Sequence, residues 1–216
     1  MTLDLFADQP PVEPSEELLA PGTVLLRAFA RASAPALMSA VAAVARQAPF
    51  RQMTTPGGYR MSVAMTNCGR AGWTTDATGY RYGSIDPDSG MPWPAMPTEF
   101  ATLACDAAAR AGFTFAPDAC LINRYEPGSR LSLHQDRDER DFSAPIVSVS
   151  LGLPAVFLLG GERRTDKTQR VGLLHGDVLV WGGPARLRYH GVLPLREGEH
   201  SLLGRCRINL TFRKAL

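Results

Sequence analysis

The sequence predicts a mainly β fold, a double-stranded β-helix (jelly-roll) core with covering helices. Two segments, 33–47 and 97–111, have the apolar spacing and the end signals of amphipathic helices. Eight short segments after residue 118 are of β type and are separated by turns. Two helices followed by a run of short strands favour helices that cover one face of a β core.

The first half of the chain divides into three kinds of segment. Residues 1–22 are rich in Pro and Glu and are expected to be a flexible lead-in. The first helix has Ser33 as its candidate N-cap, with Leu37, Val41 and Val44 along one face. Residues 49–97 are interrupted by Gly and Pro and contain many aromatic residues, which predicts hairpins and loops. The second helix is expected to begin at Pro97 and to end at Gly112.

The second half is expected to form the jelly roll. Its predicted strands are 119–125, 129–136, 146–151, 156–159, 170–174, 177–181, 187–190 and 206–213. This gives a flexible lead-in at 1–22, an N-terminal extension at 23–117 and the jelly-roll core at 118–216. At 216 residues the three parts are expected to form one structural domain.

The charge of the chain is unevenly distributed. Residues 121–216 contain fifteen Lys and Arg and ten Asp and Glu, a balance of +5, whereas residues 1–120 contain eight and eleven, a balance of −3. The second half includes the basic cluster Arg163, Arg164, Lys167 and Arg170. Two interpretations stay open: a contact surface for a polyanion such as nucleic acid, or a solvated loop.

No segment suggests a membrane or an oxidising compartment. The chain has no long apolar run and no signal-like start, so we expect a cytoplasmic protein without a membrane partner, and a monomer. Its four cysteines are scattered and lack a CxxC spacing. They are expected to be reduced, and a zinc finger is not expected.

The segment 131–136 contains the spacing most informative about chemistry. His134 and Asp136 lie two residues apart, so on a β-strand both side chains would leave one face, and Asp138 would share it. Two imidazoles and one carboxylate are the ligand set of non-haem Fe(II) oxygenases. His190, at the end of a predicted strand, is the better placed third ligand, and His175 and His200 are the alternatives.

The last predicted strand alternates strictly between polar and apolar residues. Ile208, Leu210 and Phe212 share one face, and the other carries Arg207, Asn209, Thr211 and Arg213. In an earlier strand Asn123 and Tyr125 likewise share a face. A polar barrel interior needs a ligand or a network, because each unpaired buried donor costs about 1–3 kcal/mol. An arginine after the last metal ligand would suit a carboxylate co-substrate; an exposed edge strand is the alternative.

Several motifs together resemble the AlkB family. They are Asn123-Arg124-Tyr125, Leu133-His134-Gln135-Asp136, Ile146-Val147-Ser148-Val149-Ser150-Leu151-Gly152, Trp181-Gly182-Gly183, Tyr189-His190-Gly191 and the segment 207–213, with further similarity from about residue 20. The resemblance implies an Fe(II)- and 2-oxoglutarate-dependent dioxygenase. It would oxidatively demethylate 1-methyladenine and 3-methylcytosine in single- or double-stranded DNA, with RNA as a second candidate. The co-substrates 2-oxoglutarate and O₂ would be converted to succinate and CO₂, with release of formaldehyde.

The same resemblance implies a role for individual residues. The iron ligands would be His134, Asp136 and His190, and the residues that hold 2-oxoglutarate would be Asn123, Tyr125, Arg207, Asn209 and Arg213. The N-terminal extension would form a nucleotide-recognition lid, with Trp73 and His134 on either side of the base and with Tyr80, Met65, Thr54, Asp138 and Arg164 around the base or the strand. Leu158 and Leu159 stand where the family has a polar residue and an aromatic, a difference that bears on base selectivity.

Two other functions are compatible with these residues. One is a 2-oxoglutarate-dependent oxygenase that acts on a protein or a small molecule. The other is a non-catalytic module that binds alkylated nucleic acid. The complete ligand set argues against the module, because recognition alone does not need an open iron site.

Overall fold

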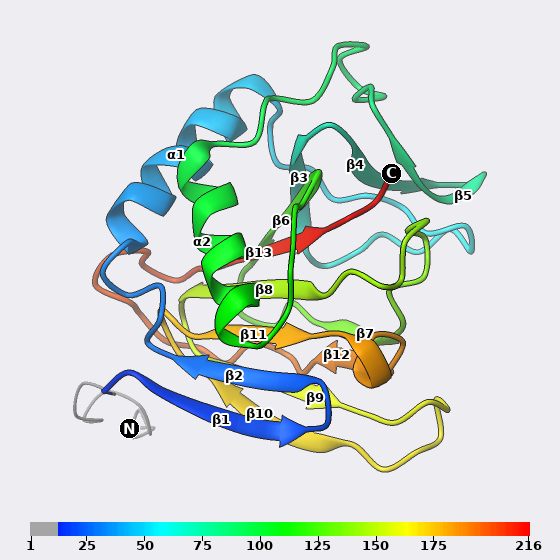
Figure 1. Cartoon of the computed structure of the whole chain (residues 1–216). Helices are drawn as coiled ribbons and strands as arrows, with labels where there is room; N and C mark the ends of the chain where they lie inside the picture. Colours follow the sequence, from blue (N-terminus) through cyan, green and yellow to red (C-terminus); the bar gives the residue numbers. More distant parts are fainter. Residues whose placement is uncertain (1–12) are drawn as a thin grey trace.

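The computed structural model describes residues 13–216, and its largest element is an antiparallel sheet of seven strands (Figure 1). The strand order is β1-β2-β11-β8-β13-β6-β3. The bounds are β1 Ser15–Ala20, β2 Thr23–Arg27, β3 Ala64–Gly69, β6 Ala119–Tyr125, β8 Ile146–Gly152, β11 Val178–Trp181 and β13 Arg207–Arg213. We call this the major sheet.

A smaller sheet of four strands packs against the major sheet and completes a β-sandwich core. Its order is β10-β9-β12-β7, with β7 at Leu131–His134, β9 at Ala155–Leu159, β10 at Gln169–Leu173 and β12 at His190–Val192. A separate hairpin joins β4 (Gly72–Asp76) to β5 (Gly79–Gly83). The mainly β architecture predicted from the sequence is therefore confirmed.

The two predicted helices are present, α1 at Ala34–Gln47 and α2 at Thr98–Arg110, and a single 3₁₀ turn covers Gly183–Ala185. Ser33 is at the N-cap of α1, but its side chain makes no capping hydrogen bond. Pro97 caps α2, and Gly112 follows with a φ of 82°, the left-handed conformation that ends helices. No helix within residues 13–216 combines the length and hydropathy needed to cross a membrane.

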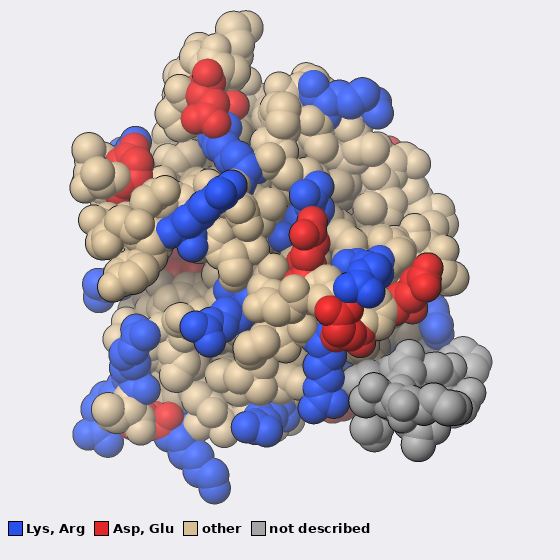
Figure 2. All heavy atoms as spheres, turned by 180° about the vertical axis from the view of Figure 1, so that it is seen from behind, with Lys and Arg blue, Asp and Glu red and all other residues tan. Residues whose placement is uncertain are grey.

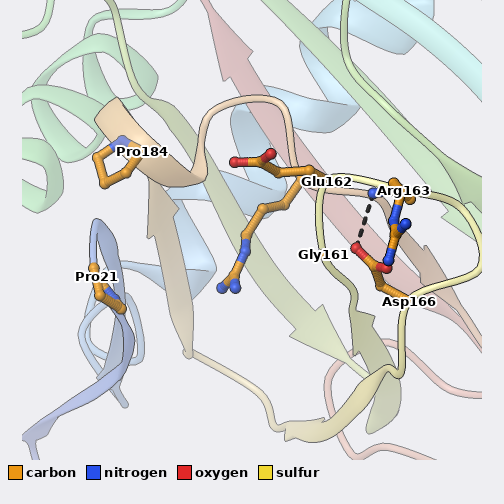
Figure 3. A pocket seen from close by; sticks show the side chains of 7 residues that line it. Pro21, Gly161, Glu162, Arg163, Asp166 and Pro184 are labelled. Carbon is orange, nitrogen blue, oxygen red and sulfur yellow. Dashed lines mark hydrogen bonds and ion pairs between the residues drawn. The ribbon is translucent and has the colours of Figure 1, made fainter.

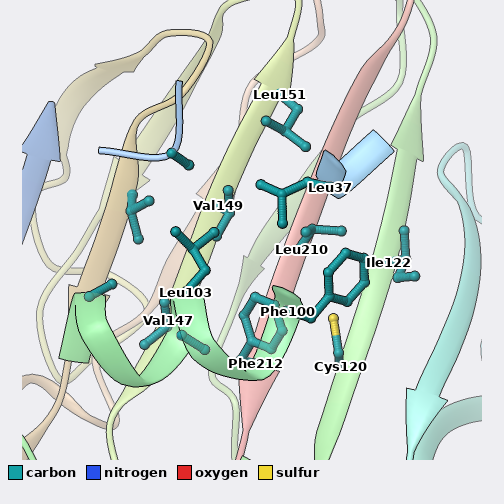
Figure 4. Packing of buried hydrophobic residues seen from close by; sticks show 14 of the residues in the cluster. Leu37, Phe100, Leu103, Cys120, Ile122, Val147, Val149, Leu151, Leu210 and Phe212 are labelled. Carbon is teal, nitrogen blue, oxygen red and sulfur yellow. The ribbon is translucent and has the colours of Figure 1, made fainter. Parts of the chain in front are cut away.

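The helices cover the outer face of the major sheet and form the first of two hydrophobic clusters. Phe100 and Leu103 of α2 and Leu37 of α1 lie over the apolar face of β13, and Phe100 meets Phe212 edge to face at 5.9 Å (Figure 4). The second cluster fills the space between the two sheets. Burial in these two layers drives the apolar and polar faces of β13 to opposite sides of the sheet.

Two sequence-based boundaries differ from the observed elements. Within the expected lead-in, residues 15–20 form β1, and residues 1–12 lie outside the described part. Because β1 is largely exposed and is held mainly by backbone pairing to β2, its side chains lack the apolar alternation that marks a strand. The sheet also does not begin at residue 118, since β2 and β3 belong to it.

The predicted strands 129–136 and 187–190 are shorter or displaced. β7 ends at His134, so Asp136 and Asp138 lie in an irregular segment and their shared face does not come from strand parity. β12 begins at His190, where the predicted strand ends. The preceding residues form a turn after the 3₁₀ helix, in which Arg188 N donates to Ala185 O.

Candidate active site

Three residues predicted as metal ligands meet at the edge of the four-stranded sheet. His134 at the end of β7 and His190 at the start of β12 are cross-strand partners, with ring centroids 4.4 Å apart. Asp136 reaches both rings: its Oδ1 is 3.6 Å from His134 Nε2, and its Oδ2 is 3.7 Å from His190 Nε2. The three candidate ligand atoms all lie within 4.8 Å of one another. This set of donors fits Fe(II) with coordination positions left open.

Backbone carbonyls fix the orientation of both histidine rings. His134 Nδ1 is 2.8 Å from Ser132 O, and His190 Nδ1 is 3.0 Å from Arg188 O. Each Nδ1 must carry a proton to make this contact, so each Nε2 keeps its lone pair. Burial and the neighbouring His134 lower the pKa of His190 to about 4. His190 is therefore neutral at pH 7, and its Nε2 lies beside Asp136 with a free lone pair, as metal binding requires.

Aromatic side chains enclose His190 from the side of the core. Phe157 of β9 stacks on the His190 ring at 5.7 Å, and Trp181 of β11 approaches it edge-on at 5.1 Å. Leu159 is the register partner of His190 and is buried between the sheets, whereas the adjacent Leu158 is only partly buried. Of the two leucines that depart from the family pattern, Leu159 is the one that belongs to the interior wall.

Arg213, the last residue of β13, forms hydrogen bonds to the Asp136 carboxylate. Arg213 donates from Nε and Nη2 to Asp136 Oδ2 at 3.0 and 2.7 Å. Burial raises the pKa of Asp136, but the charge and the hydrogen bonds of Arg213 outweigh it, so the pKa is held well below its usual range. The Asp136 carboxylate is therefore ionised, and Arg213 fixes it in an orientation that suits a bound cation.

A second buried carboxylate, Glu139, continues the same network. Its Oε1 is 3.2 Å from Arg213 Nε, and its Oε2 is 3.1 Å from Arg186 Nη2. Arg186 also donates to Asp136 O at 2.7 Å and to Ala144 O at 3.1 Å. Tyr82 of β5 donates its hydroxyl to Glu139 Oε1 at 2.9 Å. Two carboxylates and two guanidiniums thus balance in charge beneath the ligand cluster.

Arg207, at the other end of β13, is buried without a charged partner. It is 1% exposed, and within residues 13–216 it donates only from Nη2, to Ser150 Oγ at 2.9 Å, while Nε and Nη1 have no partner there. Burial lowers its pKa to about 10. Two unmet donors on a buried cation predict an anionic ligand, and the planar fork suits a carboxylate.

Amide and hydroxyl groups line the layer between Arg207 and Arg213. Asn123 Nδ2 donates to Asn209 Oδ1 at 3.1 Å, while Asn123 Oδ1 is buried without a partner. Asn209 donates to Ser148 Oγ at 2.8 Å, and the Thr211 hydroxyl donates to Asn209 Oδ1 at 2.9 Å. Tyr125, the register partner of Arg207, is also buried in this layer, and burial raises its pKa. The exposed-edge alternative for this strand is wrong, because β13 lies between β8 and β6.

The β4–β5 hairpin is hydrogen-bonded to residues 138 and 139, just after Asp136 in the chain. Trp73 and Tyr80 stack with centroids 5.6 Å apart and an interplanar angle of 18°. Trp73 Nε1 donates to Asp138 Oδ2 at 2.8 Å. Met65 is buried in β3 opposite Asn123, whereas Thr54 is exposed in an isolated bridge with Arg60. The rings and Asp138 thus form one group, and Thr54 lies on the surface.

Three members of the basic cluster, Arg163, Arg164 and Lys167, lie in the loop between β9 and β10, and Arg170 lies in β10. Arg164 is exposed, and Arg163 pairs with Asp166 at 3.2 Å (Figure 3). This loop borders a hollow of about 440 Å³ lined by Pro21, Gly161, Glu162, Arg163, Asp166, Pro184 and Arg188, none of which is a member of the ligand cluster. Figure 2, which views the molecule from behind Figure 1, shows Lys and Arg side chains spread over that face.

His175 and His200, the alternative third ligands, lie together elsewhere. Their ring centroids are 4.4 Å apart, and Gly152 N donates to His175 Nδ1 at 3.0 Å. A His175 Nδ1 that accepts leaves the proton on Nε2, so neither of its nitrogens is free for a metal. Neither residue is among the described candidates for metal ligands.

Tyr82, Glu139 and Arg186 build the network next to the cluster, although none of them was predicted as a site residue. Glu139 lies in a run of charged residues, a composition typical of a solvated loop. Tyr82 does carry a signal, because it is two residues from Tyr80 on one predicted hairpin. Arg186 carries none, since its partners are 42 to 50 residues away in the chain.

Comparison with known proteins places this architecture in a family. Residues 22–213 match the 2OG-Fe(II) oxygenase superfamily. The chain is 60% identical over 214 residues to the alpha-ketoglutarate-dependent dioxygenase AlkB of Salmonella typhimurium and to that of Escherichia coli, covering 99% of this chain and 98% of each relative. The solved structure of OsALKBH1 superposes with a TM-score of 0.82 at 29% identity, over 93% of this chain and all of that one.

More distant relatives extend the similarity. The chain is 35% identical over 161 residues to the DNA N(6)-methyladenine demethylase ALKBH1C of Arabidopsis thaliana, covering 62% of this chain and 35% of the relative. A 2OG-Fe(II) oxygenase from Burkholderia pseudomallei shares the fold at a TM-score of 0.53 and 19% identity, over 89% of this chain and 84% of that one. The match over nearly the full length of the bacterial relatives decides the assignment. The chain belongs to the AlkB family of 2-oxoglutarate- and Fe(II)-dependent dioxygenases.

Proposed function

We propose that this protein oxidatively demethylates alkylated bases in nucleic acid, with 1-methyladenine and 3-methylcytosine in DNA as its substrates and RNA as a second candidate. The observation that carries the oxygenase part is Arg207, a buried guanidinium with two unmet donors on the layer that faces the His134, Asp136 and His190 cluster. Support for the substrate class comes from the relatives, which include DNA demethylases and a tRNA demethylase of Schizosaccharomyces pombe.

His134, Asp136 and His190 would hold the iron. Their nitrogens and carboxylate oxygen are the donor set of non-haem iron sites, and the hydrogen bonds to Nδ1 fix each imidazole in the neutral tautomer that a metal requires. Bound Fe(II), together with 2-oxoglutarate and O₂, supplies the oxidising chemistry that an N-methyl carbon needs. Arg213 would keep the Asp136 carboxylate ionised and oriented.

Arg207 would bind one carboxylate of 2-oxoglutarate through its free Nε and Nη1. Asn123, Asn209 and Tyr125 line the same layer and would position the co-substrate between the sheets. Arg213 would contribute its charge to the other carboxylate, although its donors also serve Asp136 and Glu139. A dicarboxylate would thus have a cation near each end.

The base would enter from the side of the β4–β5 hairpin. Its N-methyl group is inaccessible in a duplex stack, so the nucleotide must be single-stranded or turned out. Trp73 and His134 would face the two sides of the ring, with Tyr80 and Met65 at its periphery and Thr54 and Arg164 on the path of the strand. Asp138 would accept from the exocyclic amine, and its negative charge would favour the cationic methylated base over the neutral one.

Mass spectrometry of methylated oligonucleotides tests this proposal. With Fe(II), 2-oxoglutarate and air, an oligonucleotide with one 1-methyladenine should lose one methylene unit in mass, and the unmethylated oligonucleotide should not change. A panel with 3-methylcytosine, in single-stranded DNA, duplex DNA and RNA, ranks the substrates. If no methylated oligonucleotide changes while 2-oxoglutarate is consumed, the substrate is a protein or a small molecule instead.

The cytoplasmic address and the monomeric state stay predictions. Size-exclusion chromatography with light scattering checks the second of them, and a mass near 23.4 kDa is expected.

A further inference from the structure

The β4–β5 hairpin is attached to the segment 136–139 by two hydrogen bonds of different character. Trp73 Nε1 donates to Asp138 Oδ2 at 2.8 Å, and Asp138 is exposed. Tyr82 donates its hydroxyl to Glu139 Oε1 at 2.9 Å, and Glu139 is only 6% exposed. A hydrogen bond to a buried carboxylate is stronger and less readily exchanged for water than one at the surface.

Glu139 is linked in turn to Asp136, one of the three candidate ligands. Its Oε1, which accepts from Tyr82, also lies 3.2 Å from Arg213 Nε. Arg213 Nη2 contacts Asp136 Oδ2 at 2.7 Å. A continuous path of three polar contacts therefore leads from the hairpin through Glu139 and Arg213 to the ligand carboxylate, and its members from Glu139 onward are buried.

The two attachments differ in what a bound base would ask of them. Under the proposed function, Asp138 would also accept from the exocyclic amine of the base, so the carboxylate that accepts from Trp73 is shared with the substrate. Tyr82 and Glu139 have no such role, and their hydrogen bond can remain. It would then be the buried polar link between the hairpin and the segment that carries Asp136.

From this arrangement we infer that Tyr82 and Glu139 are positioning residues that couple the hairpin to the metal site. Binding of the metal restricts the motion of Asp136, Arg213 and Glu139. The hydrogen bond from Tyr82 to Glu139 extends this restriction to the hairpin that would hold the base. Coupling between sites is reciprocal, so metal and co-substrate should tighten binding of a methylated base by a factor α of at least about five. The inference rests on the proposed function.

The test compares Tyr82→Phe with a control in the same hairpin. The Phe variant keeps the ring and removes only the hydroxyl, and Glu139 keeps both arginines, so the fold should persist. Thr78→Ala is the control, because the Thr78 hydroxyl bonds only within the turn, to Asp76 Oδ1 at 2.6 Å and from Arg81 at 3.0 Å. Circular dichroism melting confirms that both variants are folded.

Binding of a fluorescent 3-methylcytosine oligonucleotide is measured by anisotropy, once with EDTA and once anaerobically with Mn(II) and 2-oxoglutarate. The ratio of the two dissociation constants is α. We expect α of at least about five for the wild type and for Thr78→Ala, and a value near one for Tyr82→Phe. An unchanged α in Tyr82→Phe, or an α of one in the wild type, overturns the inference.

Hydrogen exchange supplies a second readout that needs no nucleic acid. Mn(II) with 2-oxoglutarate should slow exchange of the amides in 72–83 in the wild type and in Thr78→Ala, but not in Tyr82→Phe. Equal protection in all three proteins contradicts the inference. Failure of the proposed function looks different: the methylated oligonucleotide would then bind no better than its unmethylated counterpart under either condition.

Discussion

Two pairs of histidines in this molecule have the same ring separation and opposite chemistry. His134 and His190 are 4.4 Å apart, and so are His175 and His200. In the first pair each Nδ1 meets a carbonyl oxygen, and a carboxylate lies beside both Nε2 atoms. In the second pair His175 Nδ1 accepts from a backbone amide, and the charge of Arg31 acts on the ring more strongly than that of Asp177.

The difference shows that proximity of imidazoles does not define a metal site. What defines it is the group that each ring's second nitrogen contacts, because that contact decides which nitrogen keeps a lone pair. The sign of the neighbouring charge affects whether a cation can bind. The Asp136 carboxylate beside the first pair attracts a cation, and the Arg31 guanidinium beside the second pair repels one.

Removal of one histidine from each pair should therefore have unequal effects, and this is the largest difference we expect. His190→Ala should lower Fe(II) affinity by more than about 10²-fold and abolish 2-oxoglutarate turnover, since even outer contacts of a metal ligand contribute up to that factor. His200→Ala should leave both within about twofold. Isothermal titration with Mn(II) and a succinate assay measure these effects. Equal losses in the two variants would show that the second pair also binds the catalytic metal.

The two arginines of β13 also differ in their partners. Arg213 is paired with two carboxylates, whereas Arg207 has two donors without a partner in the described structure. Arg207→Met should weaken 2-oxoglutarate binding by on the order of 10²-fold, through loss of about 3 kcal/mol of charge-assisted hydrogen bonds. It should destabilise the fold far less than loss of a paired arginine, because the guanidinium has no charged partner within residues 13–216 and donates only to Ser150 Oγ. Arg213→Met should instead lower the free energy of unfolding by about 3–5 kcal/mol, because two buried carboxylates lose their partner.

Calorimetric binding of 2-oxoglutarate and urea unfolding give the two quantities separately. A stability loss in Arg207→Met as large as that in Arg213→Met would mean that Arg207 has a structural partner that the described contacts lack. In that case the carboxylate assignment for Arg207 fails.

A smaller effect is expected from the basic loop between β9 and β10. Arg163 already pairs with Asp166, so Arg164 and Lys167 should carry most of any phosphate contact. Charge reversal of both, Arg164→Glu with Lys167→Glu, should reduce the slope of log K against log salt by about 0.7 per lost contact on single-stranded DNA. Anisotropy titrations at several salt concentrations measure the slope. An unchanged slope would show that these residues belong to a solvated loop and do not contact phosphates.

The smallest effect concerns pH and the second histidine pair. Burial, His200 and Arg31 lower the pKa of His175 to about 4, and Asp177 opposes them only weakly. Because the folded-state pKa lies below the unfolded value of about 6.5, this group's contribution is complete above pH 6.5 and is lost as pH falls toward 4.

Urea unfolding at several pH values tests this contribution. In His175→Asn the loss of stability between pH 6.5 and 4 should be smaller by about 1 kcal/mol, a figure discounted because the ring is half exposed. The reference is the wild type over the same pH range. A steeper loss in the variant would contradict the sign of the shift.

How far the sequence predicts this molecule depends on the range of the interactions involved. The alternation of residues 207–213 is local, and it placed Arg207, Asn209 and Arg213 on one buried face. The relation between Asp136 and His134 was predicted from strand parity, which is wrong because β7 ends at His134. Asp136 reaches the rings through Arg213, which is 77 residues away. Such contacts depend on tertiary packing and leave no local pattern.

The central claim is that oxidation of 2-oxoglutarate is coupled to removal of a methyl group from a base. Its most direct test is the ratio of formaldehyde to succinate, measured in one reaction with Fe(II) and a 3-methylcytosine oligonucleotide. We predict a ratio near one, strict dependence on added Fe(II), and no formaldehyde from the unmethylated oligonucleotide. Succinate formation without formaldehyde, with the methylated oligonucleotide bound and unchanged, would contradict the account.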